Sequence, residues 1–244
     1  MKIKHYYFFG DEIQKDLKSD KLNENNWDVL RIHGDNAFSI ENDIREYENN
    51  CQQAEEYKKR AETICDILKK NNVNKIVSLG VGKGILEWHI KKQMPNICMI
   101  CTDYARAGVE QLKKVFLTCE EIQWCDMLET DYSVWNEATI LMYRVSTEFT
   151  EQEWKLIFNK MYEGGVKRII FVPTEVLTLR IAFNEIRGHF FNKLFRRKDI
   201  MCGWMYSKKE FINMYEKFYS IANEVKMEDT VVWDLKLKEK VGEN

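Results

Sequence analysis

Three glycines at alternate positions separate an apolar run from a helix-like segment in the stretch KIVSLGVGKGILEWHI, Lys75 to Ile90. Glycine at a strand-to-helix junction permits a tight turn, and its missing side chain lets a ligand approach the backbone. The helix that follows presents unpaired N–H groups and the positive end of its dipole. Gly80, Gly82 and Gly84 therefore predict a site for an extended ligand with an anionic end.

The spacing of these glycines argues against two common nucleotide sites. A dinucleotide fingerprint has the form G-x-G-x-x-G, whereas Ile85 occupies the place of its third glycine here. The phosphate-binding loop of many nucleotidases ends in Gly-Lys-Ser/Thr after a four-residue gap, and this pattern is also missing. An NAD-dependent Rossmann enzyme is thus disfavoured, and it stays open as an alternative.

Two carboxylates follow the glycines, each at the end of a later apolar run. Asp103 ends NICMICTD, where a carboxylate can accept both hydroxyls of a ribose. Asp126 ends EIQWCD, where a side chain can reach the edge of an adenine. Each of them alone could be an ordinary loop-capping aspartate. Taken together with the glycine turn, they favour an adenosyl ligand.

These residues need a sheet that brings their strand ends together. After residue 70, strand-like and helical patterns alternate, which predicts a mostly parallel sheet with helices on both faces. The stretches SIANEVKM and TVVWDLKLK predict a final antiparallel pair. The expected strands cover 75–80, 97–102, 121–125, 138–143 and 167–172, and the expected helices cover 85–94, 105–117, 150–163 and 207–219.

The N-terminal part has a different pattern. Residues 1–38 are aromatic at first and then polar, which predicts a short helix and loops that cap the sheet. From Ser39, a plausible N-cap, apolar residues recur at steps of three and four, which predicts one long helix over 40–70. A helix packed on the sheet is the simpler interpretation, and a coiled-coil homodimer is the alternative. The stripe consists of Ile44, Tyr47, Cys51, Ala54, Ala61, Cys65 and Leu68.

The composition bears on partners and location. With 37 basic and 39 acidic residues the formal net charge is −2, so the overall balance favours neither nucleic acid nor an anionic membrane. No apolar run approaches the roughly 20 residues that cross a bilayer, and the N-terminus turns acidic too early for a signal peptide. We therefore expect a cytoplasmic protein, a monomer or homodimer, with no membrane partner.

The cysteines raise the question of a metal. Seven is an odd number, so reduced thiols are expected rather than a disulfide framework. The pairs Cys98-x2-Cys101 and Cys119-x5-Cys125 have the spacing of zinc half-sites. NICMICTDYA, however, has the pattern of a buried strand, in which Cys98 and Cys101 point to opposite faces. We therefore expect no metal.

Residues 60–235 resemble the class I methyltransferases that use S-adenosylmethionine. The resemblance rests on VSLGVGKG as the Gly-rich motif, CTDYA as the acidic end of the second strand, WCDML as the third-strand motif, and the final hairpin. It implies an α/β, Rossmann-like fold with a seven-stranded sheet whose last strand is antiparallel. It also implies an N-terminal cap over 1–55, a donor-binding domain over 56–244, and S-adenosylmethionine as cofactor.

The resemblance also implies the residues of the donor site. Ser78 stands where the family usually has an acid that helps hold the donor's amino group, so a relative that has kept the fold and lost activity is an alternative. Lys83 places a cation in the turn, where it pairs with the donor carboxylate or faces solvent. The set expected at the donor is Ser78, Gly80, Gly82, Lys83, Gly84, Asp103, Tyr104, Asp126, Met127 and Arg144.

Methyl transfer is an in-line displacement, so the enzyme mainly positions its reactants and sometimes removes a proton. The residues after the fourth strand, YRVSTEF, would lie beside the methyl group. Because the family's amino-methylating branches often carry Asn/Asp-Pro-Pro-aromatic here, an oxygen nucleophile on a small molecule is the better expectation. Tyr143, Glu148 and His189 are the catalytic candidates, although a surface glutamate and a solvated histidine are simpler interpretations.

The stretch RIAFNEIRGHFFNKLFRRKD, 180–199, falls where such proteins build a substrate lid, which we expect over 180–206. Its apolar residues are expected to pack inward, and its basic residues would suit an anionic acceptor. A solvated basic helix end is the alternative, and RNA is a lesser option. The apolar set is Ile181, Phe183, Ile186, Phe190, Phe191, Leu194 and Phe195, and the basic set is Arg187, Lys193, Arg196, Arg197 and Lys198.

Overall fold

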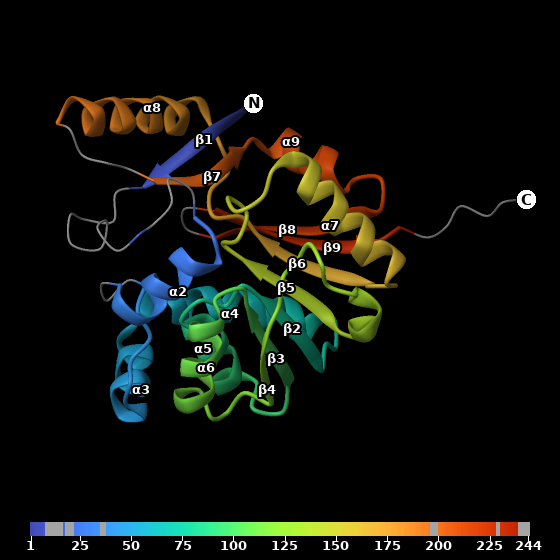
Figure 1. Ribbon diagram of the computed structural model, residues 1–244. Helices are drawn as coiled ribbons and strands as arrows, with labels where there is room; N and C mark the ends of the chain where they lie inside the picture. Colours follow the sequence, from blue (N-terminus) through green and yellow to red (C-terminus); the bar gives the residue numbers. More distant parts are fainter. Residues whose placement is uncertain (8–16, 18–21, 35–37, 196–199, 228–229, 239–244) are drawn as a thin grey trace, which may run out of the picture.

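A seven-stranded sheet with the order β4-β3-β2-β5-β6-β9-β8 forms the centre of the molecule (Figure 1). The computed structural model describes residues 1–7, 17, 22–34, 38–195, 200–227 and 230–238. The pairs from β4 to β6 are parallel, whereas β9 is antiparallel to both β6 and β8. The predicted mostly parallel sheet with an antiparallel last strand is therefore confirmed. Its strands are β2 (Lys75–Leu79), β3 (Cys98–Asp103), β4 (Glu121–Trp124), β5 (Thr139–Tyr143), β6 (Arg168–Val172), β8 (Tyr219–Met227) and β9 (Thr230–Leu237).

Helices cover both faces of this sheet, as its apolar strands predict. On β2, Ile76 faces one apolar cluster, whereas Val77 and Leu79 face the other, which follows from the period of two along a strand. Four helices border the first cluster: α3 (Ile44–Gln53), α4 (Glu55–Lys70), α5 (Ile85–Gln93) and α6 (Arg106–Val115). The 3-10 turn η1 (Tyr132–Trp135), α7 (Glu151–Glu163) and α9 (Lys208–Tyr215) border the second cluster.

The prediction of one long helix over 40–70 is wrong, because the chain breaks at Ala54 between α3 and α4. The first helix is capped by Asp43 rather than Ser39. The ring of His89 on α5 lies near the break, where burial lowers its pKa and the backbone of Cys51 and Ala54 acts in the opposite direction. Tyr47, Cys51, Ala61, Cys65 and Leu68 of the apolar stripe are buried inside the chain, whereas Ile44 is 38% exposed, so most of the stripe packs within the protein.

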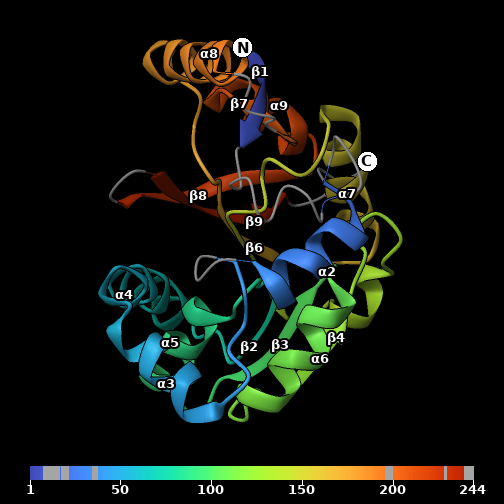
Figure 2. The same ribbon diagram turned by 60° about the vertical axis from the view of Figure 1, so that its left-hand side comes forward.

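The N-terminus contributes a strand that the sequence pattern did not predict. β1 (Lys2–Tyr7) pairs antiparallel with β7 (Ile200–Tyr206), near the other end of the chain. The helix α8 (Leu179–Leu194) lies on β1, where the Tyr6 and His189 rings stack with centroids 4.2 Å apart. Figure 1 and Figure 2 show β1, β7 and α8 as a small lobe beside the large sheet.

The short helix predicted within residues 1–38 is α2 (Glu24–His33), which begins at the N-cap Asn23. It lies against α6 (Figure 2). The Asp28 carboxylate accepts a hydrogen bond from the Ala107 N–H at 2.8 Å, and Glu24 pairs with Arg106 at 2.8 Å. These contacts place α2 beside the carboxyl ends of β3 and β4.

The predicted inward packing of the apolar side chains on α8 holds for Ile181, which is partly buried, and is wrong for the others. Ala182 is buried, whereas Phe183, Ile186 and Phe190 are each more than 60% exposed. The cause is that β1 covers only one face of the helix. Of the predicted basic cluster, Arg196, Arg197 and Lys198 lie outside the described residues. In the described part of the chain, no helix is long and apolar enough to cross a membrane.

Candidate functional site

The predicted glycine turn is present. Gly80, Gly82 and Gly84 have φ values of 69°, 59° and 69°, in the left-handed region that favours glycine. The Gly80 N–H donates to the Thr102 carbonyl at 2.8 Å, which ties the turn to β3. A Cβ at Gly80 would lie 2.5 Å from Val145 Cγ1, so a side chain there would displace the wall opposite. The missing side chain at Gly80 thus leaves room for Val145 to pack against the turn.

Asp103 connects this turn to the end of β3. Its Oδ2 accepts a hydrogen bond from the Gly82 N–H at 2.7 Å, and its Oδ1 accepts one from the Ala105 N–H at 2.9 Å. The side chain is fixed and buried. Because each carboxylate oxygen has two lone pairs, Asp103 keeps the capacity to accept two further hydroxyl groups.

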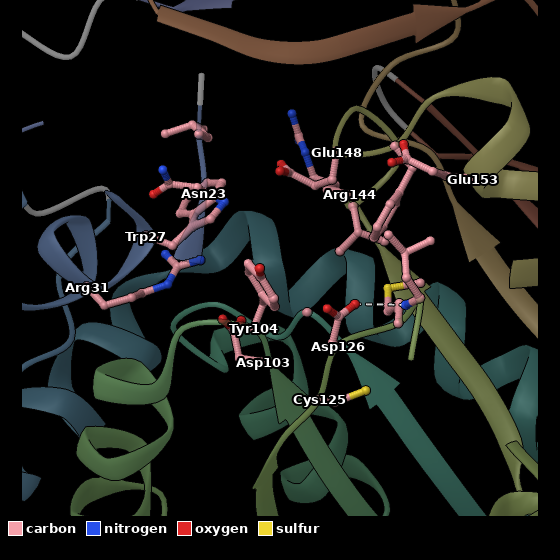
Figure 3. Close-up of a pocket in the computed structure, with 16 residues that line it drawn as sticks. Asn23, Trp27, Arg31, Asp103, Tyr104, Cys125, Asp126, Arg144, Glu148 and Glu153 are labelled. Carbon is pink, nitrogen blue, oxygen red and sulfur yellow. Dashed lines mark hydrogen bonds between the residues drawn. The ribbon is translucent and has the colours of Figure 1, made fainter. Parts of the chain in front are cut away.

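A cavity of about 290 Å³ lies over these strand ends, between them and α2 (Figure 3). Its volume is near the lower bound of about 300 Å³ for small-molecule sites. In Figure 3 the side chains of Asp103, Asp126 and Glu148 come from three different strand ends, and a dashed line marks the bond from the Leu128 N–H to Asp126. Seven predicted residues line the cavity: Gly80, Asp103, Tyr104, Asp126, Met127, Arg144 and Glu148.

The other predicted residues do not line this cavity. Gly82 and Gly84 belong to the turn beside it. Lys83 forms a buried ion pair with Glu41 at 2.7 Å. The Tyr143 hydroxyl accepts a hydrogen bond from Arg60 at 2.6 Å, and His189 lies in the small lobe.

Ser78 is completely buried in β2, and its hydroxyl donates to Glu87 Oε1 on α5 at 2.6 Å. Burial raises the pKa of the Glu87 carboxyl to about 7, and the hydrogen bond from Ser78 offsets only part of this effect. A buried carboxyl on the adjacent helix is therefore in direct contact with Ser78.

We expect Glu87→Gln to gain stability relative to the wild type as the pH rises. The folded protein holds the Glu87 proton up to a pH of about 7, whereas the unfolded chain releases it near 4.5. This stabilising contribution is complete below the unfolded pKa and is lost as the pH rises through the folded one. Glutamine has no charge to bury. Urea unfolding should show the variant's relative stability rising by about 1 kcal/mol between about pH 6 and about pH 8. A difference that is independent of pH would contradict the assignment.

The side chains that α2 contributes were missed at the sequence level. A Cβ built at Gly82 would lie 3.0 Å from a terminal nitrogen of Arg31, so this guanidinium lies against the glycine turn. Arg31 donates to the Phe38 carbonyl at 3.2 Å, and its Nε is buried with no hydrogen-bond partner in the described part of the chain. No spacing in the sequence marks Arg31. Its role depends on the packing of α2 on α6.

Glu148 lies on the loop after β5 and faces the cavity (Figure 3). Burial raises the pKa of its carboxyl to about 7, and the nearby charge of Asp103 acts in the same direction. A hydrogen bond from the Trp27 side chain and the charge of Arg31 act against this shift. A carboxyl with a pKa near neutrality is suited to accept a proton at physiological pH.

The loop that carries Glu148 is held from two sides. Gly203 of β7 packs so closely on it that a Cβ there would lie 1.6 Å from the Thr147 carbonyl oxygen. The small lobe and α7 therefore fix the position of the Glu148 backbone. The carbonyls of Ser146, Thr147 and Phe149 accept hydrogen bonds from Trp154 Nε1 at 3.2 Å, Trp204 N at 2.8 Å and the Tyr206 hydroxyl at 3.0 Å.

Arg144 has a left-handed backbone conformation, with φ of 59°, at the edge of the cavity. Its N–H donates to the Val172 carbonyl and its carbonyl accepts from the Thr174 hydroxyl, both at 2.8 Å. This conformation costs a non-glycine residue about 1 kcal/mol. Strain that is kept beside a cavity points to a function of the side chain.

We therefore expect Arg144→Gly to be more stable than Arg144→Ala by about 1 kcal/mol, although glycine usually destabilises a chain. Both variants remove the side chain, so packing losses cancel in the comparison. Urea denaturation of the two proteins provides the measurement. An alanine variant as stable as the glycine variant would show that the backbone is not strained.

The cysteines do not gather into a site. All seven are free thiols, and Cys101 is buried in the core, whereas the Cys119 thiol donates to the Glu121 carbonyl at 3.1 Å. Within the described residues, no group of three or more His, Cys, Asp or Glu side chains is placed to hold a metal ion.

Comparisons of the sequence with protein-family models and with curated proteins gave no match. Solved structures of the same fold were found. Human N-acetylserotonin methyltransferase in complex with SAM has a TM-score of 0.54 and 12% identity, over 94% of this chain and 66% of that one. Magnesium protoporphyrin IX methyltransferase from Synechocystis PCC 6803 with bound SAH has a TM-score of 0.53 and 12% identity, over 75% and 84%. A Rhodobacter sphaeroides protein named as a Zn-dependent alcohol dehydrogenase has a TM-score of 0.52 and 11% identity, over 72% and 89%.

These similarities, together with the strand order and the antiparallel β9, show the fold. The chain has the fold of the class I, S-adenosylmethionine-dependent methyltransferases. It spans about half the length of two other matched proteins, PigF and PhzM.

Proposed function

We propose that this protein is an S-adenosylmethionine-dependent methyltransferase that acts on a hydroxyl group of a small molecule. The observation that carries the proposal is that Asp103, fixed at the glycine turn, and Glu148, a carboxyl with a pKa of about 7, line one cavity. Two of the similar structures are methyltransferases described with SAM or SAH bound. In this proposal the cavity takes both the donor and the reacting end of the acceptor.

The parts of the donor match the cavity in order. The carboxylate of its methionine portion would bind Arg31 and the nearby N-terminus of α5. The buried Nε of Arg31 has no hydrogen-bond partner within the described residues. Its ribose hydroxyls suit the remaining lone pairs of Asp103. Its adenine suits the strand-end residues Tyr104 and Asp126.

When bound, S-adenosylmethionine supplies a methyl group on a positively charged sulfur. The acceptor oxygen forms a bond to the methyl carbon while the carbon–sulfur bond breaks and its electron pair goes to sulfur. The acceptor also loses a proton, and Glu148 is the group in the cavity whose pKa suits it to take that proton. Tyr143 and His189, which were also candidates, do not line the cavity.

We further infer that the cap over 1–55 and the insertion over 180–206 act together as one lid, with 56–244 as the donor-binding domain. The pairing of β1 with β7 supports this inference, because it joins the two segments directly. The contact of Gly203 with the Thr147 carbonyl links the lid to the loop that carries Glu148. Closure of such a lid would exclude water from the transferring methyl group.

If the acceptor is anionic, Arg144 is the residue that would bind its charged group, rather than the basic residues of α8. Arg144 lines the cavity beside Glu148, whereas Arg187 and Lys193 are exposed on the outer side of the small lobe. A phosphate or carboxylate on the acceptor would therefore meet Arg144.

A crystal structure with S-adenosylhomocysteine tests this proposal. We expect the ribose on Asp103, the adenine beside Tyr104 and Asp126, and the sulfur facing Glu148. The same experiment with NAD discriminates the alternatives. NAD in this cavity without the adenosyl ligand would favour a Rossmann oxidoreductase, and neither ligand would favour a relative that has lost activity.

A further inference from the structure

The outward face of α8 is apolar along its whole length. Side chains at 179, 183, 186, 190 and 194 follow steps of three and four, which places them on one face of the helix. We call them the outer stripe. A continuous exposed apolar patch of this kind marks an interaction surface. The outer stripe consists of Leu179, Phe183, Ile186, Phe190 and Leu194, which are between 61% and 80% exposed.

The opposite face of α8 attaches the helix to the protein. Ala182 is buried there, Glu185 lies 2.9 Å from the His5 ring, and His189 stacks on Tyr6. Figure 1 and Figure 2 both show α8 at the outer side of the small lobe. The outer stripe therefore faces away from the rest of the described chain.

Basic residues flank the outer stripe on both sides. At 100° per residue, Lys193 falls on one side of it, and Arg180 and Arg187 fall on the other. All three are exposed, and none forms an ion pair with a described residue. Glu185, the acid of this helix, is turned inward against His5. The outward charges of α8 are thus all positive, and the sequence continues with Arg196, Arg197 and Lys198.

We propose that α8 binds the surface of an anionic lipid bilayer, with its axis parallel to the membrane plane. A helix of this kind places its apolar face at the boundary of headgroups and acyl chains, where flanking cations meet lipid phosphates. With 16 residues it is too short to span the roughly 20-residue bilayer core. A second copy of the chain is the poorer occupant, because two outer stripes in contact would bring like charges together.

Sedimentation of the full-length protein with phosphatidylglycerol vesicles and with phosphatidylcholine vesicles tests this proposal. We expect binding to the anionic vesicles that weakens as salt is added. The double variant Phe183→Ser, Phe190→Ser should lower the partition coefficient at least about tenfold. Each of Arg187→Gln and Lys193→Gln should lower it by about fivefold.

Matched variants control for nonspecific effects. Leu117 is 66% exposed on the main domain, so Leu117→Ser removes an equally exposed apolar side chain away from α8 and should leave binding unchanged. Lys209→Gln on α9 removes an exposed cation in the same way. Because all these side chains are exposed, thermal unfolding should be unchanged.

Three results would overturn the proposal. The wild type could stay in the supernatant with phosphatidylglycerol vesicles, or the double phenylalanine variant could bind as tightly as the wild type. Sedimentation equilibrium could show a dimer that the double variant dissociates, without vesicle binding, which would assign the outer stripe to a second copy. Vesicle binding requires no methyl donor, so its failure leaves the proposed function untouched.

Discussion

The Asp103→Ala variant is expected to raise the dissociation constants of S-adenosylmethionine and S-adenosylhomocysteine by at least about a hundredfold. The carboxylate would accept two ribose hydroxyls, and each hydrogen bond to a charged group contributes about 1.5–3 kcal/mol. The variant also frees the Gly82 N–H, which Asp103 Oδ2 holds at 2.7 Å. The loss of the ribose hydrogen bonds and the loss of the bond that holds the glycine turn both weaken binding of the adenosyl ligand.

Titration calorimetry measures this effect, and two variants serve as controls. Glu137→Ala removes an exposed carboxylate outside the cavity and should bind the donor like the wild type. Asp103→Asn keeps the shape of the side chain and loses its charge, so it should bind with intermediate affinity. Binding by Asp103→Ala within about threefold of the wild type, less than one hydrogen bond contributes, would remove Asp103 from the donor site.

The second large effect is expected at Glu148. Glu148→Gln should lower kcat by about 10²–10⁴-fold, the usual contribution of a general base. Because the ionised carboxylate is the active form, the wild-type rate should rise with pH up to about 7 and then level off. The variant should lose this limb of the profile and still bind S-adenosylhomocysteine.

The rate is measured with labelled donor and any hydroxyl compound that the wild type methylates. His189→Asn is the matched comparison, because His189 was the other candidate base and lies on α8 in the small lobe. It should keep both the rate and the limb near pH 7. If the rise of the rate up to about pH 7 were lost in His189→Asn and kept in Glu148→Gln, His189 rather than Glu148 would be the general base.

Much of the cavity's edge along the strand ends could be predicted from the sequence because its signals are local. The glycine turn and the carboxylates at 103 and 126 each follow an apolar strand within a few residues. Parallel strands bring such ends to one edge of the sheet, so the sequence order determines the spatial order. The structure places Gly80, Asp103 and Asp126 on one cavity accordingly.

The remaining features depend on contacts between distant segments. Arg31 reaches the glycine turn only because α2 packs on α6, and no periodicity reports that contact. β1 and β7 pair across nearly the whole chain, so neither has a hairpin signal. The apolar stripe continues across the helix break at Ala54, so its spacing does not reveal the break.

The apolar residues of α8 show a different limit. Their spacing correctly predicts an amphipathic helix. The spacing does not tell whether the apolar face packs on the protein or contacts a lipid bilayer. Net charge was equally uninformative about partners, because a total of −2 hides a helix whose outward charges are all positive. Partner predictions of this kind require the charge of a surface rather than that of a chain.

Titration of S-adenosylhomocysteine into the full-length wild-type protein tests the proposed donor site most directly. We predict one site per chain with a micromolar dissociation constant, competition by S-adenosylmethionine, and loss of the signal in Asp103→Ala. Absence of binding by both adenosyl ligands, with or without binding of NAD, would contradict the assignment of this cavity to a methyl donor.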